Sequence, residues 1–323
     1  MKKLLAVVAA ASVLCAQADT YPSRPITLVV PFAAGGPTDK SARDLALAMQ
    51  KPLGAAVILV DNAAGAGGSM GANKVAKAAP DGYTLLYHHI SMATMPALVR
   101  DIPFKVETDF EFLGLVNDVP MTLIGRPSLP AKNFKELMAW IARNKGKINL
   151  GHAGVGSASH LCGLLFQSAI QVDMTTVPYK GTAPAMADLM GGHIDLLCDQ
   201  TTSTSAQIES KRVIGYAVTT VKPLTTPALR DVPTLQSQGL KGFEVTIWQG
   251  LYAPKGTPPD VLAKINSALK VALKDPDFVR KQEELGATVV SDKRMEPAEH
   301  RKFVMAEITK WSPILKAAGV YAD

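Results

Sequence analysis

From residue 26 onward, short apolar segments typical of β-strands alternate with segments whose apolar residues recur at helical spacing. The strand-like segments are rich in Val, Ile, Leu and Thr; they read ITLVVPF, AVILVDN, YTLLYHH, INLGHA, MTTVPY, HIDLLCD and VIGYAVTT. The helix-like segments include NFKELMAWIARNKG, GTPPDVLAKINSALKVAL and KFVMAEITKWSPILKAAG. Strands that alternate with helices predict parallel sheets with helices on their faces, so the predicted fold class is α/β.

Two longer strand-like segments, near residues 110–126 and 243–256, do not fit this alternation. A chain of 323 residues is long enough for two domains. If the chain passes into a second domain and returns, it needs two crossing segments of this kind. We therefore expect a discontinuous first domain of residues 19–122 and 248–323, a second domain of residues 123–247, and a ligand cleft between them.

The first 18 residues have the order of a cleavable secretory signal: two lysines, an apolar run and the small-residue motif Ala16-Gln17-Ala18. We expect cleavage after Ala18 and export to the periplasm. Cys15 suggests a lipoprotein instead, but the bulky residue before it argues against lipoprotein processing. No later segment approaches the roughly 20 continuous apolar residues of a membrane span.

The formal net charge is +6, and loss of the two signal lysines lowers it to 6 − 2 = +4. The remaining basic residues are scattered, which argues against nucleic acid as a partner. Cys162 and Cys198 are the only cysteines after the signal. An oxidising compartment permits a disulfide between them, but two buried thiols agree with the sequence equally well.

Three Gly-rich loops each follow a strand-like segment and precede a helix-like one, at residues 31–46, 61–76 and 151–166. The first turn of a helix has backbone N–H groups without intrahelical partners, and the helix dipole adds partial positive charge, so such a junction favours an anion. The first and third loops lie in different predicted domains, which suits a ligand with a carboxylate at each end. Alternatively, the glycines serve only to form tight turns.

In the first loop, Thr38 or Asp39 is a candidate helix cap, with Pro37 holding the turn. In the third loop, Ser157 and Ser159 supply hydroxyl groups beside the free amides.

Several single residues are candidates for ligand contact, each with a structural alternative. His88 and His89 are neighbours on a strand and point to opposite faces, so they do not suit one metal ion, but one of them can donate a hydrogen bond in the cleft. His160 lies in the first turn of the helix after the third loop. Asp199 ends a strand where α/β proteins bind ligands, or it caps the next helix. Trp248 forms a cleft wall or belongs to the core.

Two patterns suggest enzymes, and neither is complete. Ser69 lies in GGSMG, which matches the G-x-S-x-G nucleophile pattern, but the preceding strand ends several residues earlier and nothing supports Asp195 and His300 as its partners. The dinucleotide pattern that starts at Gly65 has Met70 in place of its third glycine. No H-x-x-x-H, H-E-x-x-H or C-x-x-C spacing occurs. We expect no enzyme activity, no cofactor and no metal.

Five blocks of the sequence, taken together, resemble one known family. They are YPSRPITLVVPFAAGGPTD, DNAAGAGGSMGANKVAKAAPDGYTLL, GHAGVGSASHL, VPYKGTAPAMADLMGGHIDLLCD and VPTLQSQGL. In order and spacing they resemble the Bug family of periplasmic solute receptors of tripartite tricarboxylate transporters, over essentially the whole chain after the signal. The resemblance implies a type II periplasmic-binding-protein fold, in which two α/β domains close around a small carboxylate.

The resemblance also implies which residues hold the ligand, through backbone amides, small hydroxyls and ordered water at two loops. The acid after the GGHID strand corresponds to Asp199. The family usually has small polar residues after GYTLL, whereas this chain has YHHIS, which reaches the far end of the ligand. The residues that match the two loops of the family are Ala34, Gly35, Gly36, Thr38, Asp39, Gly156, Ser157, Ser159 and His160, and Asp199 joins them. From this sequence itself, we also expect His88, His89, Ser91 and Trp248 to contact the ligand.

We therefore expect a monomeric receptor that captures a small dicarboxylate or related organic acid by domain closure and delivers it to the membrane subunits of a tripartite transporter. Aliphatic diacids of about four to six carbons and aromatic ones such as terephthalate both fit, and His88, His89 and Trp248 slightly favour a planar ligand. Two alternatives remain: a secreted serine hydrolase using Ser69, and a ligand sensor for a two-component system.

Overall fold

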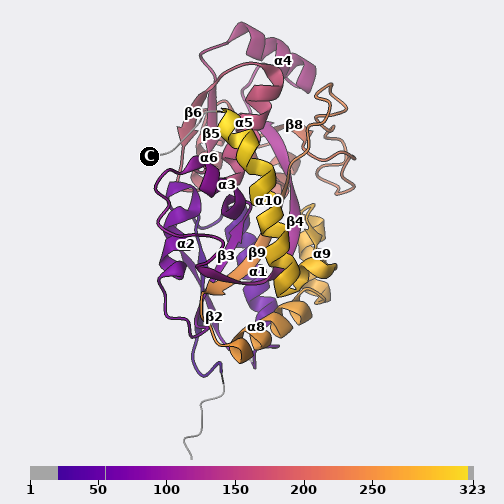
Figure 1. Ribbon diagram of the computed structural model, residues 1–323. Coiled ribbons are helices and arrows are strands. Elements are labelled where there is room, and N and C mark those ends of the chain that lie inside the picture. Colours follow the sequence, from indigo (N-terminus) through magenta and orange to yellow (C-terminus); the bar gives the residue numbers. More distant parts are fainter. Residues whose placement is uncertain (1–20, 55, 319–323) are drawn as a thin grey trace, which may run out of the picture.

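The strands form one connected sheet whose two ends come from different parts of the sequence (Figure 1). The computed structural model describes residues 21–54 and 56–318, so the signal predicted over residues 1–18 lies outside the described residues. The sheet has the order β2-β1-β3-β9-β4-β7-β5-β6, and β8 and β10 also pair with β4. The strands are β1 (Ile26–Val30), β2 (Ile58–Asn62), β3 (Thr84–His89), β4 (Phe110–Gly125), β5 (Asn149–His152), β6 (Thr175–Pro178), β7 (Leu196–Gln200), β8 (Ile214–Val218), β9 (Thr246–Pro254) and β10 (Thr288–Val289).

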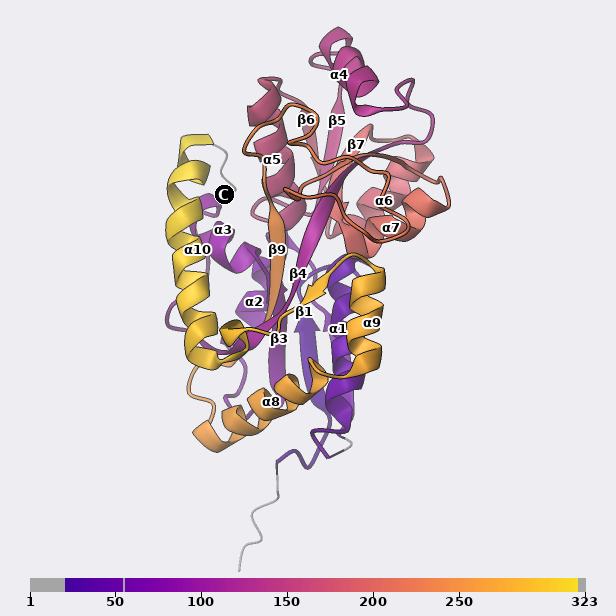
Figure 2. The same cartoon turned by 90° about the vertical axis from the view of Figure 1, so that its right-hand side faces the viewer.

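The long strands β4 and β9 connect the two ends of the sheet (Figure 2). The first part of β4 pairs with β9, as far as the Pro120–Thr246 pair. From Met121 onward β4 pairs instead with β7 and β8. One strand therefore belongs to both groups, and it changes partners between Pro120 and Met121.

The prediction of parallel sheets is confirmed at both ends and is wrong in the middle. β1 pairs in parallel with β2 and β3, and β5 pairs in parallel with β6 and β7. β4 and β9 are antiparallel to each other, β9 is antiparallel to β3, and β4 is antiparallel to β7. A strand that crosses and a strand that returns run in opposite directions, which accounts for this difference.

Helices cover both faces of the sheet, and their sequence patterns predict most of them. The helices are α1 (Pro37–Gln50), α2 (Ser69–Ala76), α3 (Ser91–Leu98), α4 (Phe134–Arg143), α5 (Ala158–Ile170), α6 (Thr182–Gly191), α7 (Thr201–Glu209), α8 (Pro259–Ala272), α9 (Pro276–Glu284) and α10 (Pro297–Ala318), with short 3₁₀ helices η1 (Ala66–Gly68) and η2 (Lys293–Met295). The three predicted helices are confirmed as α4, α8 and α10, although α10 begins before its predicted segment, at a proline that suits a first helical turn. No helix in the described part of the chain combines the length and the apolar character that a membrane crossing requires.

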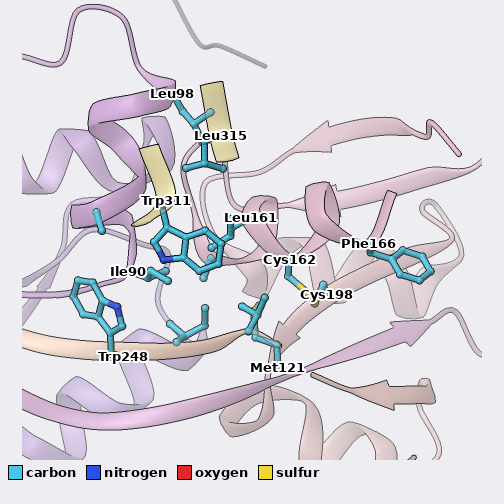
Figure 3. Packing of buried hydrophobic residues seen from close by; sticks show 14 of the residues in the cluster. Ile90, Leu98, Met121, Leu161, Cys162, Phe166, Cys198, Trp248, Trp311 and Leu315 are labelled. Carbon is cyan, nitrogen blue, oxygen red and sulfur yellow. A yellow bond between two sulfur atoms is a disulfide. The ribbon is translucent and has the colours of Figure 1, made fainter. Parts of the chain in front are cut away.

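Buried aromatic side chains hold α10 against the rest of the protein (Figure 3). The ring of Trp248, on β9, lies 5.5 Å from that of Phe303 on α10, and its indole Nε1 donates to Glu307 Oε2 at 3.1 Å. Trp311 of α10 donates to the same carboxylate oxygen at 2.9 Å. Trp311 also shares a hydrophobic cluster with Leu161 of α5, so α10 contacts elements from both ends of the sheet.

A disulfide joins Cys162 of α5 to Cys198 of β7, with a Cα–Cα distance of 6.0 Å (Figure 3). The sequence leaves open whether these two cysteines form a disulfide or remain as buried thiols, and the structure contains the disulfide. Both cysteines are buried in the core. The bond fixes α5 against the strand that ends at Asp199.

We expect the Cys162→Ala/Cys198→Ala double variant to have a free energy of unfolding about 3–4 kcal/mol lower than the wild type. The reason is that the crosslink spans a sequence separation of 36 residues and restricts the unfolded chain. Urea unfolding of both proteins, with and without dithiothreitol, measures this. The reductant should destabilise only the wild type, and equal stability of the oxidised wild type and the double variant would contradict the expectation.

Candidate functional site

A small pocket lies where loops from the two ends of the sheet meet. It is formed at the carboxyl ends of β1, β3, β5 and β7, which is where α/β proteins commonly place ligands. The pocket is lined by Phe32, Gly36, Pro37, Thr38, His89, Ala153, Ser157, Ala158, Ser159, Thr182, Asp199 and Gln200. None of these lining residues is an arginine or a lysine.

Four helices of the described chain, α1, α5, α6 and α7, begin at this pocket. Their N-cap or first residues line it: Gly36 and Pro37 for α1, Ser157 for α5, Thr182 for α6 and Gln200 for α7. No side chain caps α1, α6 or α7. Amides of the first turns and the positive ends of four helix dipoles therefore meet in one space, which favours an anion.

Small hydroxyl groups add further donors. Ser157 is the N-cap of α5, where its Oγ accepts from the His160 amide at 3.3 Å and lies 3.2 Å from Ser159 Oγ. Ser159 Oγ also accepts from the Ala153 amide at 2.8 Å, which ties the β5–α5 loop together. Across the pocket, the Thr38 hydroxyl has no hydrogen-bond partner among the described residues. It is thus available to a ligand.

His89 contributes a neutral N–H donor to the pocket. Its ring stacks on Phe32 with a centroid distance of 4.6 Å, and its Nδ1 accepts from the Ser91 amide at 3.2 Å. Burial lowers the pKa of His89 to about 3, so the ring is neutral at physiological pH. Because Nδ1 accepts a hydrogen bond, the single ring hydrogen resides on Nε2.

Among the residues that line the pocket, Asp199 is the only one with a carboxyl group. Burial raises its pKa to about 7, although the hydrogen bond from the Gln200 amide and the polar side chains of Thr182 and Ser203 oppose this shift. The Gln200 amide donates to Asp199 Oδ1 at 2.8 Å. Asp199 therefore exchanges its proton near neutral pH and can act as a donor or as an acceptor.

Six of the residues predicted from the sequence line the pocket: Gly36, Thr38, His89, Ser157, Ser159 and Asp199. The other predicted residues, which do not line it, are Ala34, Gly35, Asp39, His88, Ser91, Gly156, His160 and Trp248. Different contacts account for the positions of these eight residues.

In the first loop, Asp39 supports the loop instead of lining the pocket. The sequence predicts Thr38 or Asp39 as the N-cap of α1, but the N-cap is Gly36, so this prediction is wrong. Asp39 Oδ2 accepts from the Gly35 amide at 2.8 Å and also binds Arg43. Burial disfavours its charge, but these hydrogen bonds outweigh burial and lower the pKa of Asp39. Ala34 and Gly35 are exposed on the far side of the turn.

Two of the predicted histidines face away from the pocket. The His88 ring lies against Gly68 of η1, where a Cβ would lie 2.7 Å from its Cε1 atom. Because side chains alternate along a strand, the sequence predicts that His88 and His89 point to opposite faces, and of the two only His89 reaches the pocket. The His160 ring lies 4.9 Å from the ring of His152 on the outer side of α5, and burial lowers its pKa to about 4.

Ser91, Gly156 and Trp248 contact other parts of the fold and not the pocket. Ser91 begins α3 and is fully buried. The Gly156 carbonyl accepts from Thr94 at 2.6 Å. Trp248 faces α10, and because side chains alternate along a strand, its neighbour Gln249 faces the other way.

The sequence interpretation missed Phe32, Pro37, Ala153, Ala158, Thr182 and Gln200 as lining residues. Thr182 follows the glycine of YKGT, so a glycine followed by a small hydroxyl residue is the signal that could have identified it. Gln200 comes directly after Asp199 but belongs to no recognisable motif.

The two sides of the pocket contact each other directly. The Ala33 amide of the first loop donates to the Lys180 carbonyl at 3.1 Å. A Cβ added to Gly181 would lie 2.8 Å from the Ala33 nitrogen. Nearby, a Cβ added to Gly67 would collide with the Val155 carbonyl oxygen. Backbone contacts this close require glycine.

The arrangement around Ser69 does not form a hydrolase site. Ser69 begins α2, whereas β2 ends at Asn62, so there is no sharp turn from strand to nucleophile. Asp195 pairs with Arg126 at 2.9 Å, and His300 is buried against β4. Residues 21–54 and 56–318 contain no cluster of three or more His, Cys, Asp or Glu residues that could hold a metal ion.

Comparison with known proteins gives a consistent result. Residues 41–320 match the family described as the tripartite tricarboxylate transporter family receptor. The fold matches the structure of the periplasmic binding protein BugD, with 47% sequence identity and a TM-score of 0.90 over 94% of this chain and 100% of that one.

Two further structures contain ligands. MatC from Rhodopseudomonas palustris, with bound malate, is 36% identical with a TM-score of 0.86, over 91% of this chain and 100% of that one. R. palustris Rpa4515, with adipate, is 32% identical with a TM-score of 0.87, over 93% of this chain and 99% of that one.

The raised pKa of Asp199 predicts a pH-dependent stability difference between the wild type and Asp199→Asn. The folded protein holds this proton up to about pH 7, whereas an unfolded aspartate loses it near pH 4. The wild type therefore loses stability relative to the variant as the pH rises between these values. We expect Asp199→Asn to gain at least about 1 kcal/mol relative to the wild type between pH 4 and pH 8. Urea unfolding at several pH values measures this, and a difference that does not change with pH would contradict it.

Proposed function

Because the chain belongs to the tripartite tricarboxylate transporter receptor family, we propose that its pocket captures a small dicarboxylate or a related organic acid. Proteins of this family are periplasmic solute-binding receptors and not enzymes. We further propose that the signal over residues 1–18 directs export to the periplasm and is cleaved there, and that the closed receptor delivers its ligand to the membrane subunits of a tripartite transporter.

The observation that carries this proposal is the meeting of four helix N-termini in a pocket lined by no arginine or lysine. Amides, the hydroxyls of Thr38 and Ser157, and the neutral His89 ring can hold a carboxylate by many moderate hydrogen bonds. Since no strong ion pair has to be broken, release on opening is easy. A carboxylate close to Asp199 would favour its protonated form, which is a donor.

The pocket is small in this structure, with an interior volume of about 10 Å³, so capture of an acid requires the pocket to widen. Related structures with malate and with adipate support diacids of about four to six carbons. Phe32 and His89 form a flat wall, which keeps an aromatic diacid such as terephthalate among the candidates, while Trp248 adds nothing to that wall.

We propose that binding occurs by closure of two domains, residues 19–122 with 248–323 and residues 123–247. The change of partners along β4 between Pro120 and Met121 supports a boundary at this point. In the open form the ligand would bind one side first, and the loop contacts made on closure would then favour the closed form.

A thermal-shift screen followed by calorimetry with succinate, malate, adipate and terephthalate tests this function. We expect at least one acid to raise the melting temperature and to bind with a one-to-one stoichiometry. Binding of none of the four, or turnover of ester substrates that is abolished in Ser69→Ala, would contradict the proposal.

We expect Thr38→Val to weaken binding of the strongest of these acids by about tenfold or more, because the substitution removes a free hydroxyl donor and keeps the side-chain shape. The melting temperature of the unliganded protein should hardly change. Thr175→Val, on an exposed strand position, is the matched control and should bind normally. Equal affinity of the wild type and Thr38→Val would exclude Thr38 from the site.

Domain closure is tested by a pair of glycine variants. Gly67 (φ +63°) and Gly146 (φ +75°) both have left-handed backbones, so alanine strains each by about 1–2 kcal/mol. Only at Gly67 does the new Cβ collide with the opposite loop, at Val155, whereas Gly146 faces open space. We therefore expect Gly67→Ala to weaken binding by about tenfold or more and Gly146→Ala to bind normally, as measured by calorimetry. Similar affinities of the two variants would argue against closure through this contact.

A further inference from the structure

A chain of buried polar side chains leads through the sheet to the pocket. Asn117 of β4 donates to Ser41 Oγ at 3.0 Å, and Ser41 Oγ lies 2.7 Å from the Tyr87 hydroxyl. Tyr87 donates to Gln249 Oε1 at 2.5 Å, and Gln249 Nε2 donates to Gln200 Oε1 at 2.7 Å. All five residues are at most 2 % exposed, and Gln200 lines the pocket.

The hydrogen bonds of this chain run in one direction, toward the pocket. Tyr87 has one hydroxyl hydrogen and gives it to Gln249, so Ser41 is the donor in its contact with Tyr87. Gln282 donates from Nε2 to Asp44 and accepts from Asn117 at its Oε1, which fixes both of these amides. If Tyr87, Gln249 and Gln200 were reversed, Ser41 would therefore have to donate across 3.3 Å to Gln282 instead of across 2.7 Å to Tyr87. The shorter contact favours the direction that ends at Gln200.

This direction fixes how the Gln200 side-chain amide is turned. Its Oε1 accepts from Gln249, so its Nε2 group is the part left to donate. Nε2 of Gln200 has no protein acceptor among residues 21–54 and 56–318, although the side chain is almost fully buried. A buried amide that lacks an acceptor is costly unless a ligand or water supplies one.

We propose that Gln200 is a ligand-binding residue that donates from Nε2 to a carboxylate oxygen of the bound acid, and that Gln249 and Tyr87 are positioning residues that hold its amide in this orientation. This inference rests on the proposed function of the pocket. Gln249 lies on the crossing strand β9 and Tyr87 on β3, and β4 separates β9 from β7, which carries Gln200. The Gln249–Gln200 bond consequently joins strands on the two sides of β4.

Calorimetry with succinate, malate, adipate and terephthalate tests the inference, using the strongest binder of the four for all variants. Gln200→Met removes the donor at similar volume and should weaken binding by about 10–100-fold, as loss of a hydrogen bond to a charged group does. Gln200→Glu replaces the donor by an acceptor and should weaken binding at least as much. Wild-type affinity in Gln200→Met would overturn the inference.

The positioning role is tested by a double-mutant cycle. Tyr87→Phe should weaken binding by about threefold or more in the wild type and have no effect in the Gln200→Met background, because Tyr87 acts through Gln200. Equal losses in both backgrounds would show a merely structural effect and overturn this role. The matched control is Tyr252→Phe, which removes a buried hydroxyl that has no hydrogen-bond partner in the described chain and should bind normally.

The outcomes also separate this inference from the proposed function. If the wild type binds none of the four acids, the proposed function fails and the inference fails with it. If the wild type binds one of them and the Gln200 variants bind it equally well, only the inference fails.

Discussion

The meeting of four helix N-termini at the carboxyl ends of the strands is the constraint on which the rest of the site depends. Three of these helices have no side-chain cap, so their first-turn amides are donors without side-chain acceptors. An anion between them stabilises the dipoles of helices from both ends of the sheet at once. This is why the pocket needs neither arginine nor lysine, and why its side chains are hydroxyls, an amide and a neutral histidine.

The order of the strands in the sheet brings the four helix N-termini together, and glycines let the loops that carry them approach closely. β4 and β9 connect the two groups of strands, so the loops after β1 and β5 face each other across a short distance. Gly67 and Gly181 let opposite backbones touch, and α10 and the Cys162–Cys198 disulfide hold the surrounding elements in place. The core thus supports the elements on each side, and the contacts between the loops are the ones that the proposed closure would form.

The sequence predicts the elements of this fold well because strand and helix periodicities and glycine turns are local signals. The α/β class, the strands and the glycine loops that form the pocket follow from them. Side-chain direction is harder to predict. Asp39, three residues into α1, turns back to its own loop, His160 packs on His152, and Trp248 faces α10 although its neighbour Gln249 does not. The role proposed for Gln200 could not be predicted, because it depends on partners from β9 and β3 that are distant in the sequence.

A crystal structure of the protein with the strongest binder among succinate, malate, adipate and terephthalate tests the central claim most directly. Our account predicts the acid between Thr38 and Ser157, with carboxylate oxygens about 3 Å from amides at the starts of these helices and no lysine or arginine in contact. The account would be contradicted by an acid bound elsewhere, for example in the surface depression beside Lys255 and Arg301, where a pair of basic side chains is present.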